Sequence, residues 1–254
     1  MTELLEVENL TVRFPVRKKS GRFGGKTYLS AVDNVDFTVK KGETLAIVGE
    51  SGSGKTTAAL AIARLVSGET TGEVRLEGKD ILPLSQEDLK AMRRKVQVIF
   101  QDPYSSLNPR QRAEEIVRDP LQSLTDIPDQ EQRDITERLF AQVGLRPEQQ
   151  RLFPHQFSGG QRQRIGIARA LALEPELLIC DEPVSALDVS IQAQILNLLK
   201  DLQKELGLTY LFISHNLAVI DYMADRIAVM CAGRLVEQAN REDIFKNPVH
   251  PYTK

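Results

Sequence analysis

The fold of this chain is decided by the stretch Gly49-Glu50-Ser51-Gly52-Ser53-Gly54-Lys55-Thr56. It fits the pattern G-x-x-x-x-G-K-[ST], in which glycines let successive backbone N–H groups turn inward around phosphate oxygens. The stretch follows the apolar run 45–48, which predicts a strand, and precedes a helical pattern over 56–66. The N-terminus of that helix adds partial positive charge, so we predict a site for a nucleotide triphosphate.

We call residues 49–57 the P-loop. The side chain of Lys55 neutralises the terminal phosphates in this type of loop, and the hydroxyl of Thr56 is suited to bind Mg²⁺. The residues expected to contact ATP here are Glu50, Ser51, Gly52, Ser53, Gly54, Lys55, Thr56 and Thr57.

Short β-rich runs alternate with helical patterns along the chain, which predicts an α/β fold with a parallel sheet covered by helices. Alternating apolar residues over 4–39 predict strands, and the basic, glycine-containing run 17–26 between them predicts an exposed loop or a contact with a partner or lipid headgroups. Further strands are expected at 96–100, 177–180 and 210–213, and further helices at 129–143 and 190–206. A helical insert at about 105–160 is expected to interrupt one core.

Two adjacent carboxylates, Asp181 and Glu182, directly follow the apolar run 177–180. Ligands of open α/β sheets bind at the carboxyl ends of the strands. Asp181 is suited to bind Mg²⁺, while Glu182 is suited to orient an attacking water and accept its proton. Such a pair alone often marks only a strand leaving the core, but the P-loop requires a partner of this kind.

The composition is that of a globular chain without a charge bias. The 254 residues are 41% hydrophobic, with 33 Lys and Arg against 35 Asp and Glu, so we do not expect nucleic acid as a partner. Cys180 and Cys231 lie in apolar runs, which indicates packing in a reducing compartment rather than a disulfide. No apolar stretch approaches the roughly 20 residues that span a bilayer, and the acidic start is unlike a secretory signal, so we expect a cytosolic location.

The segment Phe157-Ser158-Gly159-Gly160-Gln161-Arg162-Gln163-Arg164 resembles the signature motif of the ABC (ATP-binding cassette) ATPases, with Phe157 where leucine is commoner. The order of motifs is also similar to that family: the P-loop, Gln101 as the Q-loop glutamine, the signature, Asp181-Glu182, Ser185-Ala186-Leu187-Asp188 as the D-loop, and His215 as the switch histidine. The resemblance covers nearly the whole chain. It implies a P-loop NTPase (RecA-like) core with an N-terminal antiparallel β subdomain and an inserted α-helical subdomain, in a single domain over 1–254.

In that family two cassettes pair head to tail and hold ATP between the P-loop of one and the signature of the other. The resemblance implies catalytic roles for Glu182, His215 and Gln101, Mg²⁺ ligands in Thr56, Gln101 and Asp181, and ATP contacts by Ser158, Gly159, Gly160, Gln161 and Asp188. Physical chemistry supports the signature's role, because Ser158 is a good helix N-cap and the glycines leave backbone N–H groups accessible to an anion. In isolation, however, the same string would be an ordinary helix cap.

Adenine needs a flat apolar surface, and Phe14 resembles the family's stacking aromatic. Tyr28 is the second candidate for that contact. A role in the core remains open for Phe14, because strands carry aromatic residues routinely.

Three stretches, 100–109, 181–190 and 247–253, look like the bacterial oligopeptide and dipeptide importer cassettes, a subfamily that includes nickel and glutathione importers. That resemblance implies a second cassette, two transmembrane permease subunits and, indirectly, an extracytoplasmic solute-binding protein as partners. It also implies a peripheral location at the cytoplasmic face of the inner membrane. Tyr104 and Leu107 are candidate apolar contacts for a short helix of a membrane subunit. The C-terminal extension usual in the subfamily, often with a cysteine cluster, is not found in these 254 residues.

Two other interpretations stay open at this point. A soluble ABC protein acting on ribosomes or DNA predicts tandem cassettes, a charged linker or a long coiled coil, and the sequence has none of these. A regulatory cassette that binds ATP without turnover is disfavoured by the presence of Glu182 and His215. The expected mechanism is dimer closure on two Mg-ATP, in-line attack by water positioned by Glu182, and opening as phosphate leaves.

Overall fold

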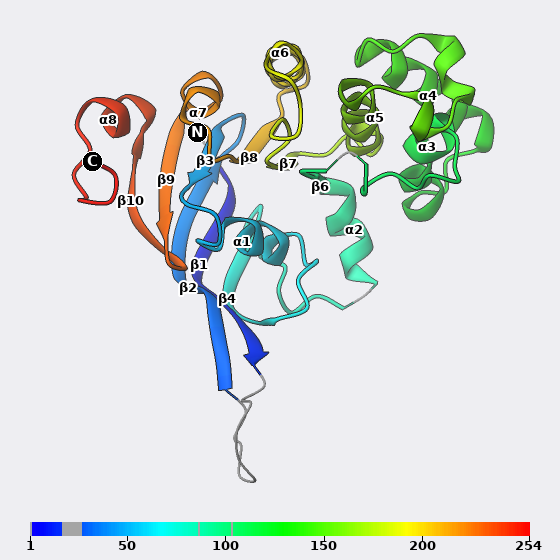
Figure 1. Cartoon of the computed structure of the whole chain (residues 1–254). Helices are drawn as coiled ribbons and strands as arrows, with labels where there is room; N and C mark the ends of the chain where they lie inside the picture. The colour runs from blue at the N-terminus through cyan, green and yellow to red at the C-terminus, as the bar shows by residue number, and fades with distance from the viewer. Residues whose placement is uncertain (1, 17–26, 86, 103) are drawn as a thin grey trace. The chain divides into compact units, whose positions relative to one another are not determined.

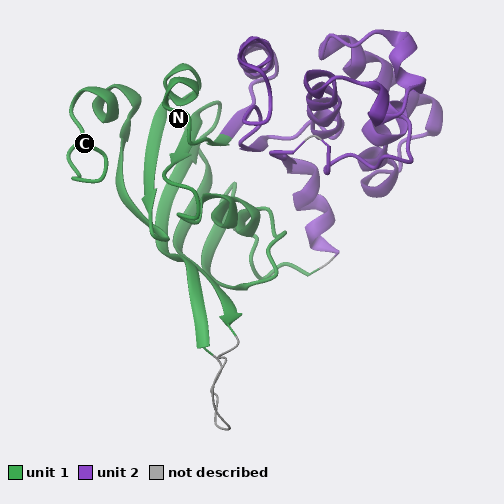
Figure 2. Ribbon diagram, viewed as in Figure 1, with its two compact units in different colours: residues 1–85, 211–254 green, residues 86–210 purple. Residues whose placement is uncertain are grey.

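The computed structural model describes residues 2–16, 27–85, 87–102 and 104–254 (Figure 1). The chain forms two compact units: unit 1 comprises residues 1–85 and 211–254, and unit 2 comprises residues 86–210 (Figure 2). The loop expected over 17–26 lies outside the described residues. Strand β8 (Thr209–Ile213) crosses the boundary between the units in the sequence.

Unit 1 contains an antiparallel sheet built around two long strands. Its strands are β1 (Glu3–Val16), β2 (Thr27–Lys40), β4 (Glu69–Leu76) and β5 (Lys79–Asp80), in the order β2-β1-β4-β5. Leu5 of β1 pairs with Val39 of β2 and Leu76 of β4, and all three side chains are buried. Period-two alternation of apolar residues places them on one face of the sheet. The antiparallel β subdomain expected from the sequence is therefore confirmed.

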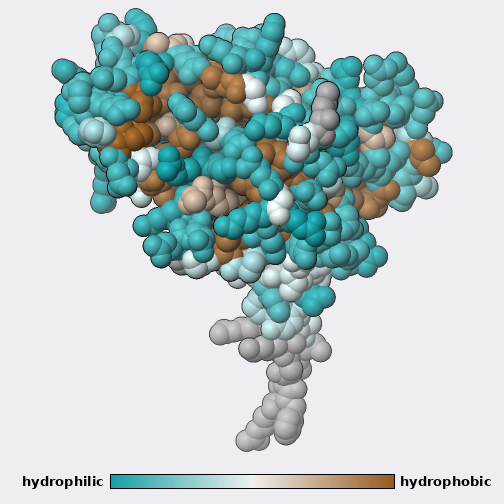
Figure 3. All heavy atoms as spheres, turned by 180° about the vertical axis from the view of Figure 1, so that it is seen from behind, coloured by the Kyte–Doolittle hydropathy of each residue, from teal (hydrophilic) through white to brown (hydrophobic). Residues whose placement is uncertain are grey.

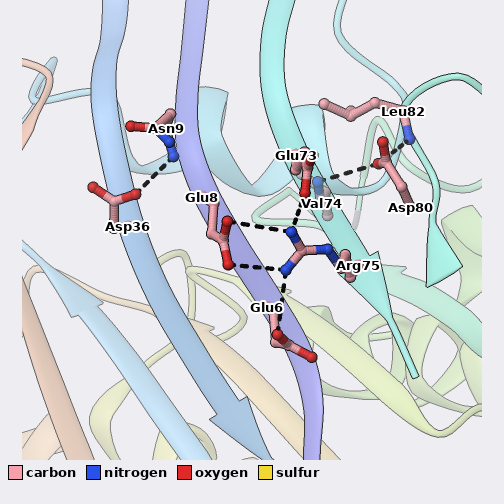
Figure 4. A network of polar contacts seen from close by, with 9 residues as sticks. All are labelled: Glu6, Glu8, Asn9, Asp36, Glu73, Val74, Arg75, Asp80 and Leu82. Atoms are coloured by element: carbon pink, nitrogen blue, oxygen red, sulfur yellow. Dashed lines mark hydrogen bonds and ion pairs between the residues drawn. The ribbon is translucent and has the colours of Figure 1, made fainter. Parts of the chain in front are cut away.

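The exposed side of that sheet carries a network of charges (Figure 4). Arg75 on β4 bonds Glu8 on β1 at 2.9 Å and approaches Glu6 at 3.5 Å. The hydrogen bond to Glu8 raises the pKa of the guanidinium. Between the strands, the backbone N–H of Asn9 donates to Asp36 at 2.7 Å, at a register shift in the β1–β2 pairing. Such cross-strand pairs stabilise β1 against both of its neighbours, β2 and β4.

A second group of strands in unit 1 places the P-loop. Strand β3 (Thr44–Val48) is buried throughout and runs parallel to β9 (Arg226–Cys231), which pairs antiparallel with β10 (Arg234–Asn240). The helices of this unit are α1 (Lys55–Ile62), α7 (Leu217–Met223) and α8 (Arg241–Lys246). The P-loop joins β3 to α1, as the sequence predicts.

Helix α1 is shorter than the pattern over 56–66 suggests. It ends at Ile62, and Arg64 has the left-handed φ of 57°. The N–H of Leu65 donates back to the carbonyl of Leu60 at 2.8 Å, the Schellman closure of a helix end. Leu65 is consequently 49% exposed and does not continue the buried face of Ala58 and Ile62. That part of the expectation was wrong, since a Schellman end with arginine in the left-handed position lacks the usual glycine signal.

Unit 2 combines parallel strands with helices. Strand β6 (Val96–Ile99) runs parallel to β7 (Leu177–Asp181). The remaining elements are α2 (Asp88–Lys95), α3 (Ala113–Leu124), α4 (Asp129–Gln142), the 3₁₀ helices η1 (Pro147–Arg151) and η2 (Pro154–Gln156), α5 (Gly159–Leu171) and α6 (Val189–Leu206). The helices expected at 129–143 and 190–206 are confirmed as α4 and α6. The limits of the insert and the single-domain assignment stay predictions.

Hydrophilic residues cover most of the face seen in Figure 3, and hydrophobic residues show between them in patches. The two most exposed large apolar side chains among the described residues come from separate places: Val189 at the start of α6 and Val249 after α8. Single exposed apolar side chains are normal on soluble surfaces. Among the described residues, no helix combines the length and apolar character needed to cross a membrane.

Candidate functional site

The glycines of the P-loop are required by its backbone and by its neighbours. Gly49 and Gly54 have backbone φ angles of 152° and 104°, values that residues with a side chain rarely adopt. A Cβ atom at Gly49 would lie 2.0 Å from the carbonyl oxygen of Met230, and one at Gly54 would lie 2.3 Å from that of Ala31. Gly52, with a φ of 80°, meets nothing within 4 Å and is needed for its conformation alone. The loop is therefore wrapped between two backbone segments distant in the sequence.

Lys55 is folded into this loop. Its side chain is 5% exposed, and Nζ donates to the carbonyl oxygens of Gly49 at 2.8 Å and Glu50 at 2.7 Å. Ser53 Oγ lies 3.4 Å from the same nitrogen. An anionic oxygen attracts an ammonium in this position more strongly than a neutral carbonyl oxygen does, because it adds charge–charge attraction. The loop thus holds the Lys55 ammonium where the sequence predicts a contact with the terminal phosphates.

Other parts of unit 1 hold the loop in place. The N–H of Gly233, after β9, donates to the carbonyl of Ser53 at 2.9 Å, and the N–H of Asp33 on β2 donates to the carbonyl of Gly233 at 2.8 Å. The N–H of Glu50 donates to the hydroxyl of Tyr252 at 3.1 Å. The sequence does not predict these supports. They join residues far apart in the chain, and no local pattern marks them.

The aromatic residues proposed for adenine lie on the hairpin that passes the loop. Phe14 is half-buried on β1 and pairs with Leu29 on β2, two residues before Ala31, whose carbonyl meets Gly54. Tyr28 pairs with Pro15 and is 44% exposed. Neither aromatic residue is fully buried in the core, and the adenine contact stays a prediction for both.

The two carboxylates of unit 2 stand at the end of β7. Asp181 is the last residue of that strand and is 4% exposed. Glu182 has a left-handed φ of 45°, which costs a non-glycine residue about 1–2 kcal/mol. The turn is fixed by Ser185, whose N–H and hydroxyl both bond the carbonyl of Glu182, at 3.2 and 3.1 Å. Strained backbone of this kind is typical of functional positions.

Gln101 reaches the same carboxylate. It follows β6, the parallel neighbour of β7, and its Nε2 donates to Glu182 Oε2 at 3.1 Å. The carboxyl ends of parallel neighbouring strands meet at one edge, which explains why residues 81 positions apart in the sequence touch. Two of the three predicted catalytic residues are therefore in contact.

Cys180, the residue before Asp181 and Glu182, is a fully buried free thiol. Burial, and then the charge of Asp181, raise its pKa well above the ordinary value. The thiol stays protonated and packs in the strand, as expected from the sequence. Cys231 also has a free thiol and ends strand β9.

The signature segment is held by its own residues. Ser158 Oγ accepts from the N–H of Gln161 at 3.3 Å, and Gln161 Oε1 accepts from the N–H of Ser158 at 3.0 Å, which is a capping box at the start of α5. A Cβ at Gly160 would lie 2.4 Å from Cγ2 of Ile191 on α6. One at Gly159 would lie 3.2 Å from Leu187. The glycines thus let α5 approach α6 and the segment before it.

The segment after Gln101 is tied to α5, which corrects one expectation. Leu107 is only 2% exposed, so it packs inside unit 2 and is not available as a surface contact for a membrane subunit. Tyr104 is 62% exposed, and its ring lies 3.8 Å below the guanidinium carbon of Arg162. Arg169 donates to the carbonyl of Ser106 at 2.7 Å. The sequence does not distinguish Tyr104 from Leu107, because burial of a loop leucine depends on tertiary packing.

The two remaining predicted residues lie at helix starts. Asp188 is the N-cap residue of α6, and its exposed side chain makes no capping bond. His215 is exposed in the turn between β8 and α7, where the side chain of Asn216 caps α7 by accepting from Ala218 N–H at 3.0 Å. His215 belongs to unit 1 with the P-loop, whereas Gln101, Glu182 and Asp188 belong to unit 2.

The chain is similar in sequence to known ATP-binding proteins. The family model described as ABC transporter matches residues 32–185. The chain is 50% identical over 253 residues to the oligopeptide transport ATP-binding protein AppF of Bacillus subtilis (strain 168), covering 99% of this chain and 76% of that one. It is 46% identical over 251 residues to the dipeptide transport ATP-binding protein DppF of Escherichia coli (strain K12), covering 99% and 74%.

A solved structure agrees with these relatives. The dimeric post-hydrolysis state of the ATP-binding cassette MJ0796, bound to ADP and Pi, matches with a TM-score of 0.80 at 30% identity, covering 93% of this chain and 98% of that one. The fold expected from the motifs, a P-loop NTPase core with an antiparallel β subdomain, is thereby confirmed. With its P-loop, signature and Asp-Glu pair in the family's order, the chain belongs to the ABC transporter family of ATP-binding cassettes.

Proposed function

We propose that the chain is the ATP-hydrolysing subunit of a bacterial ABC importer for oligopeptides, dipeptides or related small solutes. The observation that carries the catalytic part is the hydrogen bond from Gln101 to Glu182, a carboxylate held in a strained turn at the end of β7. The names of AppF and DppF support the substrate class. ATP is the expected nucleotide, bound by the P-loop around Lys55.

In the proposed reaction a water oxygen attacks the γ-phosphorus in line with the bond to the β–γ bridging oxygen. That bond breaks, ADP leaves, and the carboxylate of Glu182 accepts the water's proton. Gln101 holds the carboxylate through its amide N–H. His215 is expected to hydrogen-bond the γ-phosphate. Lys55 carries the charge that offsets the terminal phosphates.

The residues present fit Mg²⁺ as the metal. Thr56, Gln101 and Asp181 offer hydroxyl, amide and carboxylate oxygens, the ligands that Mg²⁺ prefers, with nucleotide phosphates completing the shell. Among the described residues there is no group of three or more His, Cys, Asp or Glu that would hold a metal by itself. When bound, Mg²⁺ would neutralise charge on the phosphates.

The proposed unit of function is a dimer of cassettes. Ser158 to Gln161 and Asp188 would contact the ATP held by the partner's P-loop, with the N-terminus of α5 directed at its phosphates. The MJ0796 cassette, solved as a dimer with ADP and Pi, supports a dimer as the unit of function. Two transmembrane permease subunits and, indirectly, an extracytoplasmic solute-binding protein are the further proposed partners, which places the chain at the cytoplasmic face of the membrane.

Two observations disfavour the alternative functions. The relatives at 45–50% identity are named as transport proteins, which favours the transporter over a soluble ABC protein acting on ribosomes or DNA. Contact between Gln101 and Glu182 favours turnover over a cassette that only binds ATP.

The test is ATP hydrolysis by the wild type and by Glu182→Gln, with Glu137→Gln, an exposed glutamate of α4, as the matched control. We expect Glu182→Gln to lose roughly 10²- to 10⁴-fold in rate, the size of a general-base contribution. The control should hydrolyse like the wild type. Glu182→Gln should also elute as a dimer in ATP. Equal rates in all three proteins would refute the assigned base.

A further inference from the structure

The residues after α8 form a compact turn, which we call the C-terminal clasp (residues 247–253). The N–H groups of Thr253 and Lys254 donate to the carbonyl of His250 at 3.0 and 3.2 Å, and the N–H of Tyr252 donates to Nδ1 of the same histidine at 3.2 Å. These bonds close one turn on itself. Proline at 251 fixes φ at the bend. The clasp therefore has a defined shape of its own.

The clasp is attached to β10 through one carboxylate. Glu237 accepts the N–H of Val249 at 2.8 Å and the N–H of His250 at 3.0 Å. The side chain of Thr253 and the two N–H donors hold the pKa of Glu237 below its ordinary value. The two backbone hydrogen bonds to this one side chain fix the position of the clasp relative to β10.

From this anchored position the clasp reaches the P-loop. The hydroxyl of Tyr252 accepts the N–H of Glu50 at 3.1 Å, across 202 positions of sequence. The carbonyl of the same Glu50 accepts Nζ of Lys55 at 2.7 Å. Glu50 is thus hydrogen-bonded to Tyr252 through its N–H and to Lys55 through its carbonyl oxygen.

We propose that Tyr252 is a positioning residue for the P-loop, which fixes the orientation of Glu50 and through it the resting position of Lys55. This inference rests on the proposed function, because it assigns the loop to ATP. Holding the loop in one conformation before ATP arrives lowers the ordering cost of binding. Tyr252 itself need not touch the nucleotide, so its removal should change ATP affinity more than the rate of the chemical step.

The direct test is amide hydrogen exchange of Glu50 in the nucleotide-free protein, measured by NMR. Tyr252→Phe removes only the accepting oxygen. We expect exchange at Glu50 to become roughly 2- to 10-fold faster, the effect of one neutral hydrogen bond. Tyr222→Phe is the matched control, since Tyr222 is another half-exposed tyrosine of unit 1, on α7.

The functional test is ATP affinity in the Glu182→Gln background, which prevents turnover. Tyr252→Phe should weaken Kd by roughly 2- to 10-fold. Glu237→Gln, which loosens the anchor of the clasp, should act in the same direction, and the double variant should lose less than the two single effects combined, because both act through one contact. Tyr222→Phe should leave Kd unchanged.

The inference is overturned if Glu50 exchange and ATP affinity in Tyr252→Phe equal those of the Tyr222→Phe control. Additive effects of Tyr252→Phe and Glu237→Gln on Kd would also refute it, since the two residues would then act separately. The exchange experiment needs no ATP, so it stands apart from the proposed function. A wild type that neither binds nor hydrolyses ATP would refute the proposed function, whereas altered Glu50 exchange would still support the contact.

Discussion

The P-loop and the signature segment are both glycine-rich starts of helices, yet they are held in different ways. The P-loop depends on backbone contacts with Ala31 and Met230 and on hydrogen bonds from distant parts of unit 1. The signature closes its own capping box between Ser158 and Gln161. A Cβ at Gly160 would meet Ile191 and one at Gly159 would meet Leu187, and both of these contacts are with side chains. Similar sequences can therefore respond very differently to substitution.

The largest effect is expected at Gly54. Gly54→Ala would force a side chain into a φ of 104° and within 2.3 Å of the carbonyl oxygen of Ala31, a backbone atom that has no rotamer to change. We expect a loss of about 3 kcal/mol or more in the free energy of unfolding, together with loss of ATP binding. Urea denaturation and ATP titration measure the two effects.

Gly166→Ala is the matched control for that substitution. Gly166 lies inside α5, and an added Cβ meets nothing within 4 Å. Alanine should stabilise the helix there by about 0.5–1 kcal/mol. A Gly54→Ala protein as stable as the wild type would show that the P-loop can relax, and the contrast between the two segments would be lost.

Gly160→Ala is expected to have an intermediate effect. The new methyl would lie 2.4 Å from Cγ2 of Ile191, but that atom belongs to a side chain that can shift. We expect a loss of about 1–3 kcal/mol, the usual cost of overpacking. In the double variant with Ile191→Ala the clash is removed, so thermal unfolding should show strong non-additivity. If the stability losses of Gly160→Ala and Ile191→Ala were additive, the contact between these two residues would not be the cause of the destabilisation.

Ser158→Ala tests the local support of the signature. Loss of the capping oxygen should cost about 1 kcal/mol of stability, measurable in denaturant. Ser158→Asp, which keeps a capping oxygen, should retain most of that stability but place a negative charge where the partner's ATP is expected, and so reduce ATP-dependent dimer formation of Glu182→Gln. Unchanged dimerisation would argue against the signature as a phosphate contact.

The smallest expected effect is the pH dependence of the C-terminal clasp. The folded-state pKa of Glu237 lies below its ordinary, unfolded value, so its stabilising contribution is complete above that ordinary value and is lost as pH falls through the lower folded pKa. The difference in Tm between wild type and Glu237→Gln should therefore shrink as pH falls from 6 to 3. A difference that grows on acidification would contradict this assignment.

Residues in short patterns could be predicted from the sequence with good accuracy. The P-loop, the strand before Asp181 and helix α6 obey local rules of glycine conformation and apolar periodicity, and the structure has them within one or two residues. The predicted end of α1 was wrong, because Arg64 occupies a left-handed position at which the sequence usually has glycine. The predicted surface position of Leu107 was wrong as well, since its side chain is buried and Arg169 of α5 ties the neighbouring Ser106 to unit 2.

The sequence by itself predicted the family, which the comparisons confirm, and the chemistry proposed for this protein: which residues are expected to bind phosphate and which carboxylate is expected to accept a proton. Their spacing is short, so local backbone geometry is enough to place them. Only the tertiary structure decided what holds those residues in position. The contact of Gln101 with Glu182 and that of Tyr252 with Glu50 join residues 81 and 202 positions apart. Such contacts arise when separate strands and turns pack together, and no local pattern records them.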